Sequence, residues 1–267
     1  MTPPPDATVE RWLFDYVTTT SLAHKLTPPP RPERWADDGP RRLAAPGRPP
    51  ELRVEARARK RPRRGALSSP ARRAELFHTF LHHELQAAEL FAWAALAFPD
   101  TPRAFRAGLL GILDDELRHM TLYRQHLLAL GADFGAFPVR DWFWQRVPAC
   151  ETPLAFVALM GLGLEGANLD HAARFADELE QAGDLDGARL ERRIGEEEIP
   201  HVRFARFWWE RWAGTLELDA WARTLPPPLS PALLRGEPIA REARRRAGFD
   251  DAFVTGLGTC KLEPRGS

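Results

Sequence analysis

Residues 114–120 read DDELRHM and residues 196–202 read EEEIPHV, so a Glu-x-x-His motif occurs twice at an offset of 82 residues. A glutamate precedes the first motif by 32 residues, and another precedes the second motif by 33 residues. The duplicated set consists of Glu84, Glu116 and His119, and of Glu165, Glu198 and His201. A repeat of this kind indicates two equivalent helix pairs.

The four glutamates of this set have apolar residues three and four positions away, which share their face on a helix. Glu84 follows Phe80 and Leu81 at these spacings, and Glu198 follows Ile194. A carboxylate in an apolar stripe faces the core, where ionisation without compensation costs on the order of several kcal/mol. We therefore predict that positive charge compensates all four carboxylates.

The pattern between residues 70 and 212 predicts an all-α fold, because apolar residues recur at helical spacing and β-branched runs are absent. Four helices are expected, at 70–98, from about 102 to 130, from about 154 to 183 and from about 184 to 212. Asp100 or Thr101 is expected to cap the second helix, with Pro102 in its first turn. Short turns make two antiparallel pairs, and the aromatic crossover at 132–151 lets the second and third helices run parallel. This is the connectivity of a ferritin-like four-helix bundle with one long crossover.

Thirteen of the 25 prolines fall within residues 1–70, so this segment is expected to be an extended Pro/Arg-rich N-terminal arm. A short helix at about 8–21 carries apolar residues that predict docking of the arm on the body. We therefore expect an arm at 1–70, the bundle at 71–212 and a C-terminal extension at 213–267, with one short helix near 241–246.

In a ferritin-like bundle, one Glu from each of two helices and a Glu-x-x-His from each of the others form a di-iron or di-manganese ligand set. Four carboxylates carry four negative charges, which two divalent ions neutralise. Carboxylate and imidazole donors favour iron or manganese, so the expected cofactor is two Fe ions, two Mn ions or a mixed Mn/Fe pair. Glu116 and Glu198 are expected to bridge the metals, with Glu84 and Glu165 as terminal ligands.

A third Glu-x-x-His motif, Glu75 to His78, has a mixed polar surrounding near the start of its helix and is interpreted as a chance match. Asp115, Glu197 and Tyr123 are candidates for orienting the ligands. The alternatives are a solvated carboxylate for each acid and a core position for the tyrosine.

Three glycines surround Glu165, at positions 161, 163 and 166. Glycine inside a helix indicates either a local bulge near a functional site or close helix packing. Both readings stay open at this point.

Overall charge and cysteine content exclude several classes of protein. The 267 residues contain 37 Lys and Arg and 37 Asp and Glu, which argues against a nucleic-acid-binding protein, although the basic run Arg57–Arg64 could touch RNA. Cys150 and Cys260 lack the spacing of a disulfide framework or a zinc site. No apolar run is long enough for a membrane span and the N-terminus does not read as a secretory signal, so a cytoplasmic location is expected.

Several stretches resemble a bacterial ferritin-like family that is described only as a domain of unknown function. They are LFHTFLHHELQAAELFAWAALAF at 76–98, DDELRHM at 114–120, LGADFGAFPVRDWFW at 130–144, LGLEGANLD at 162–170 and EEEIPHVRF at 196–204. The resemblance implies a di-metal bundle with the six duplicated Glu and His residues in the family's ligand positions. One departure is Pro200, where the family usually has glycine.

The function expected from these features is that of an oxidoreductase, which activates dioxygen or peroxide at two metals to oxidise a small-molecule substrate with electrons from a donor. The alternatives are a non-catalytic iron-binding or iron-buffering protein, a tRNA-modifying hydroxylase, and an interaction protein whose site has decayed. A homodimer is compatible with the sequence.

Overall fold

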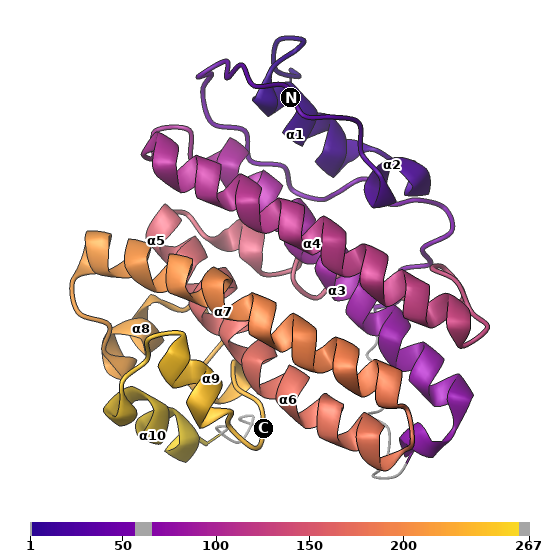
Figure 1. Ribbon diagram of the computed structural model, residues 1–267. Helices are drawn as coiled ribbons and strands as arrows, with labels where there is room; N and C mark the ends of the chain where they lie inside the picture. Colours follow the sequence, from indigo (N-terminus) through magenta and orange to yellow (C-terminus); the bar gives the residue numbers. More distant parts are fainter. Residues whose placement is uncertain (1, 57–65, 262–267) are drawn as a thin grey trace. The chain divides into compact units, whose positions relative to one another are not determined.

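The chain folds into α-helices joined by turns, short 3-10 helices and a π-helix, over the residues that the computed structural model describes, 2–56 and 66–261. The all-α expectation is confirmed for these residues. Their one isolated β-bridge joins Val54 to Val139. Residues 1–148 and 149–267 form two compact units, and each contains one of the expected helix pairs (Figure 1). Within the described ranges, no helix is long and apolar enough to cross a membrane.

In the first unit, α3 (Pro70–Ala97) packs along α4 (Arg103–Ala129), and a short turn joins the two helices (Figure 1). The N-cap of α4 differs from the expectation, because Pro102 occupies that position. Thr101 instead donates its hydroxyl to the carbonyl of Phe98 at 2.7 Å. A proline at the N-cap loses no helical bond, since the first N–H groups of a helix have no partner within the helix.

The N-terminal arm contributes α1 (Val9–Thr18) and α2 (Leu22–Leu26) to the first unit, where α1 packs against α3 and α2 against α4. Thr8 begins α1 by accepting a bond from the backbone N–H of Arg11 at 3.2 Å. Leu13, Tyr16 and Val17 have no exposed surface. The apolar face of α1 is therefore part of the core of this unit.

Buried ion pairs join the arm to α3 at Glu89. Lys25 Nζ and Arg48 Nη1 lie 2.7 and 2.6 Å from Glu89 Oε1, and Trp144 Nε1 donates to Glu89 Oε2 at 2.7 Å. Burial alone would raise the pKa of Glu89, but the charges of Arg48 and Lys25 hold that pKa below its ordinary value. Segments far apart in the sequence thus meet at one carboxylate.

In the second unit, the third expected helix is divided into α5 (Pro153–Phe156), the π-helix η3 (Val157–Glu165) and α6 (Gly166–Gln181). Helix α7 (Leu185–Ala213) packs against α6 and η3. Asp184 caps α7 by accepting a bond from Gly187 N at 2.9 Å. Pro200 lies inside α7 without ending it.

The C-terminal extension contains α8 (Leu218–Thr224), α9 (Arg241–Arg246) and α10 (Asp251–Thr259), which is more helix than the sequence predicted. Helices this short are marginal alone and depend on tertiary packing. Arg244 of α9 binds Asp170 of α6 through two bonds of 3.0 and 2.7 Å, and both side chains are fully buried. Backbone N–H groups of Gly236 and Ala240 also donate to Asp170.

We expect Glu89→Gln to lower the free energy of unfolding by about 3–5 kcal/mol, because the fully buried Lys25 would lose its counter-charge, while Arg48 would retain Asp141 as a partner. Denaturant titration followed by circular dichroism measures the change. Glu75→Gln is the control, since Glu75 forms an exposed pair with Arg72, and its effect should be below about 1 kcal/mol. Equal small losses from both substitutions would contradict a stabilising role of the buried pairs.

Candidate metal centre

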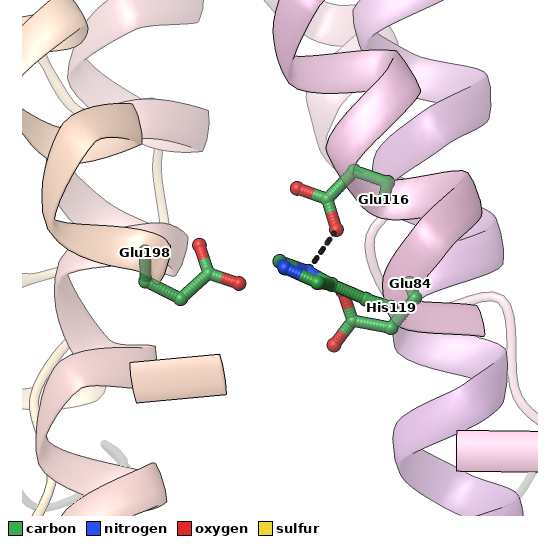
Figure 2. A group of neighbouring side chains, drawn as sticks. All are labelled: Glu84, Glu116, His119 and Glu198. Carbon is green, nitrogen blue, oxygen red and sulfur yellow. Dashed lines mark ion pairs between the residues drawn. The ribbon is translucent and has the colours of Figure 1, made fainter. Parts of the chain in front are cut away.

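Three of the expected ligands lie together between α3 and α4. Glu84 comes from α3, whereas Glu116 and His119 come from α4, where a spacing of three residues directs both to one face. One ligand atom of each lies within 4.8 Å of the others. His119 Nδ1 is 3.5 Å from Glu84 Oε2 and 3.5 Å from Glu116 Oε2, and Figure 2 marks the ion pair between His119 and Glu116. These three residues are called the first half-site.

Burial of the first half-site makes it unfavourable for both of its carboxyl groups to be ionised. Glu116 and His119 have no exposed surface, and Glu84 is 5% exposed. Burial raises the pKa of Glu84 well above its ordinary value, and the neighbouring charge of Glu116 raises it further, while His119 opposes the shift. Two carboxylates therefore compete for one imidazole in a region without bulk water.

The other three expected ligands form a second half-site in the second unit. Glu165 is the last residue of η3, and Glu198 and His201 come from α7, on which Figure 2 labels Glu198. Ligand atoms of these three residues lie within 4.8 Å of one another. His201 Nδ1 is 2.9 Å from Glu198 Oε2. All three side chains are buried, with at most 5% of each residue exposed.

The backbone before Glu165 departs from α-helical geometry. A π-helix is rare and often occurs at functional sites, because its wider turn shifts the side chains that follow it. Gly161 lies inside it at a point where a Cβ atom would collide with the Cβ of Ala205 on α7. Both readings of the glycines around Glu165, a local bulge and close helix packing, thus describe the second unit.

The donor set of each half-site fits a divalent iron or manganese ion. Each half-site offers two carboxylates and one imidazole, which are donors that these ions accept, and contains no thiolate. In the first half-site, a divalent cation would remove the repulsion between Glu84 and Glu116 that raises the pKa of Glu84. Metal ligands must bind in their deprotonated forms, so binding would also release any proton held there.

The third Glu-x-x-His motif does not form such a cluster. Glu75 pairs with Arg72 at 2.6 Å, and His78 Nε2 accepts a bond from the backbone N–H of Gly135 at 2.9 Å. The two side chains of this motif thus serve separate structural contacts.

The three candidates for orienting the ligands also contact residues outside the half-sites, and the orienting role itself stays a prediction. Asp115 pairs with Arg118 at 2.6 Å and Glu197 with Arg193 at 2.9 Å, one turn away on their own helices. Tyr123 is buried and its ring lies 6.0 Å from that of Phe77 and 5.6 Å from that of Phe80. The basic run Arg57–Arg64 lies outside the described residues, and RNA contact there stays a prediction.

Sequence reasoning missed two buried acids that follow the ligands. Glu89 comes five residues after Glu84, and Asp170 comes five residues after Glu165, so this pair repeats at the same offset as the glutamates that precede them. Glu89 lies in an apolar stretch, with Leu85 and Trp93 four residues away, which is the signal that identified Glu84. Both acids are paired with protein cations instead of facing another carboxylate.

Residues 6–255 match the family described as "Protein of unknown function (DUF455)". The chain belongs to this family. Membership of a family of unknown function, which the resemblance implied, is thereby confirmed. No curated protein and no solved structure matches the chain. The function of this DUF455 protein must therefore be argued from its own half-sites.

The raised pKa of Glu84 predicts how the folding stability of the metal-free DUF455 protein changes with pH. Above the ordinary glutamate value of 4.5, the folded state keeps a proton that the unfolded chain releases. Each further rise in pH then favours unfolding, until the folded pKa is passed. We expect Glu84→Gln to remove this contribution, so that thermal stability measured between about pH 5 and 8 falls less steeply than in the unsubstituted protein. Parallel curves would contradict a protonated Glu84.

Proposed function

We propose that the chain is a ferritin-like di-metal carboxylate protein, and that it acts as an oxidoreductase toward dioxygen or peroxide. The observation that carries the proposal is the repetition of one buried cluster, two carboxylates and an imidazole, in both units at matching positions of the sequence repeat. In this proposal, the two helix pairs assemble as one four-helix bundle, with the crossover connecting α4 to α5.

The ligand count and the charge both favour a shared pair of ions. One half-site supplies three protein donors, whereas the two together supply the four carboxylates and two imidazoles typical of di-metal bundles. Four carboxylates and two divalent ions make a neutral cluster, which lowers the cost of burial. We infer that Glu84, Glu116 and His119 would hold the ions from one helix pair, and that Glu165, Glu198 and His201 would hold them from the other.

A bound pair of reduced iron or manganese ions supplies electrons and open coordination positions for dioxygen or peroxide. The protein's own contribution is to hold the ligands in place and to keep bulk water away from them, which follows from their burial. Burial and the charge of Glu116 favour the protonated form of the Glu84 carboxyl group without metal, and metal binding would release a proton held there. A small-molecule substrate and a separate electron donor complete the proposed reaction.

An iron-binding or iron-buffering role is the alternative that uses the same ligands. Storage requires a shell of many subunits, which pack through the outer faces of their helices. In this chain α1 covers part of α3, and α9 covers part of α6 and α7. This observation favours an enzyme over a storage shell.

We expect purified protein from cells grown with iron and manganese to contain about two metal ions per chain, as measured by elemental analysis. A Glu116→Ala, Glu198→Ala double variant should lose them, because it removes one ligand of each half-site. Glu75→Ala is the matched control, since it disrupts the third Glu-x-x-His motif and should leave the metal content unchanged. Metal at background level in all variants, after anaerobic reconstitution as well, would overturn the di-metal proposal.

The size of the metal-loaded protein separates the enzyme from the storage alternative. We expect gel filtration with light scattering to give a monomer or a dimer, because the arm and the extension occupy surfaces that a shell would need. A large closed assembly that accumulates iron beyond the two sites would instead favour storage.

A further inference from the structure

Two arginines of the crossover, Arg140 and Arg146, form no ion pair with any of the residues described. The Nε atoms of both are buried and have no hydrogen-bond partner there. Arg146 Nη1 donates only to the backbone carbonyl of Trp142, at 2.8 Å. Burial and the nearby charge of Arg140 lower the pKa of Arg146, and no carboxylate acts against this shift. Two like charges thus lie near each other, and none of the described carboxylates pairs with either of them.

The nearest acid in the sequence cannot neutralise them. Asp141 accepts bonds from Arg48 Nε at 2.9 and 3.0 Å, and lies 3.3 Å from His82 Nε2. These partners keep the pKa of Asp141 at about 2, against the opposing effect of burial. The carboxylate is therefore already engaged as an ion, and the positive charge of the two arginines remains available to a ligand.

One aromatic ring contacts this charge, and a second lies on the next residue of the crossover. The guanidinium of Arg146 lies 3.9 Å from the centre of the Trp142 ring. Phe143 stacks on His83 of α3 with ring centres 5.0 Å apart and an angle of 29° between the planes. Arginines next to aromatic rings are the combination with which proteins bind phosphate groups that carry flat rings.

The segment is also held rigidly on α3. Gln86 of α3 accepts a bond from the backbone N–H of Phe143 at 3.1 Å and donates to the carbonyl of Arg140 at 3.3 Å. His83 directly precedes Glu84 of the first half-site in the sequence. The helix that carries the candidate ligand Glu84 therefore also holds the backbone of the segment that carries the arginine pair.

We propose that Arg140 and Arg146 bind a phosphate group, and that the neighbouring aromatic rings accommodate a flat part of the same ligand. A phosphate accepts charge-assisted bonds from two guanidinium groups and supplies the negative charge with which neither arginine is paired. The binding site stands on the crossover alone. Only the further step, that the bound molecule is the substrate to be oxidised, rests on the proposed function.

Isothermal titration of metal-free protein with pyrophosphate tests the site without involving the metals. Arg146→Gln should weaken binding about tenfold or more, because it removes one charge-assisted partner, and Arg140→Gln should act likewise. Arg189→Gln makes the same change of net charge at an exposed residue paired with Asp186, and it should leave the affinity unchanged. Arg146→Lys, which keeps the charge but not the planar fork, should lie between these extremes.

Parallel titrations with adenosine monophosphate and with single-stranded RNA distinguish a small phosphate ester from a nucleic acid as the source of the phosphate. Binding of any of these probes that requires Arg140 and Arg146 supports the site. The absence of arginine-dependent binding for all three probes would overturn it.

Thermal unfolding adds a second readout. Arg146→Gln should not destabilise the protein if the pair serves a ligand, whereas a marked loss of stability would indicate a structural role. Metal content is measured separately, so loss of the metal proposal and loss of the phosphate site remain distinct results.

Discussion

A carboxylate that is buried between helices requires positive charge close by to remain ionised. Helix α3 carries two such carboxylates, Glu84 and Glu89, and their surroundings differ. Glu89 forms structural ion pairs with the buried side chain of Lys25 and the partly buried side chain of Arg48. Glu84 instead faces Glu116, with the imidazole of His119 as the group that favours its ionised form. Protein cations neutralise Glu89, whereas a second carboxylate lies beside Glu84. Burial alone therefore does not distinguish a candidate metal ligand from a structural acid, and the neighbouring charges must be compared as well.

The same division of roles recurs in the second unit. Asp170 follows Glu165 at the spacing by which Glu89 follows Glu84, and Arg244 supplies its counter-charge. In the first unit the cations come from the N-terminal arm, and in the second unit the cation comes from the C-terminal extension. The repeat therefore comprises a candidate metal ligand and an anchoring acid on the same helix. The N-terminal arm and the C-terminal extension thus have a physical role, because each provides the positive charge that one anchoring acid requires.

Much of this arrangement could be predicted from local sequence pattern. Helical periodicity predicted the two helix pairs. Apolar surroundings distinguished the candidate ligands of both half-sites from the third motif, whose residues Glu75 and His78 contact Arg72 and Gly135. The part that could not be predicted depends on contacts between distant residues. Lys25 lies 64 positions before Glu89, and Arg244 lies 74 positions after Asp170, so no window of sequence contains either pair. The π-helix was anticipated only as one of two readings of its glycines, because both a bulge and close packing require the absence of a side chain.

The ion pairs of Glu89 and Asp170 also help to hold the candidate metal ligands in position. A metal site binds tightly when its donors are held in place before the ion arrives, because less ordering then opposes binding. Glu84 and Glu89 lie on the same helix, α3. Glu165 and Asp170 lie on the continuous helical stretch formed by η3 and α6. The N-terminal arm and the C-terminal extension each bind one anchoring acid, and each therefore restrains the helix that carries a candidate ligand. The protein itself supplies the cations that neutralise the anchoring acids, whereas the carboxylates of the half-sites are the groups that the proposed metal ions would neutralise.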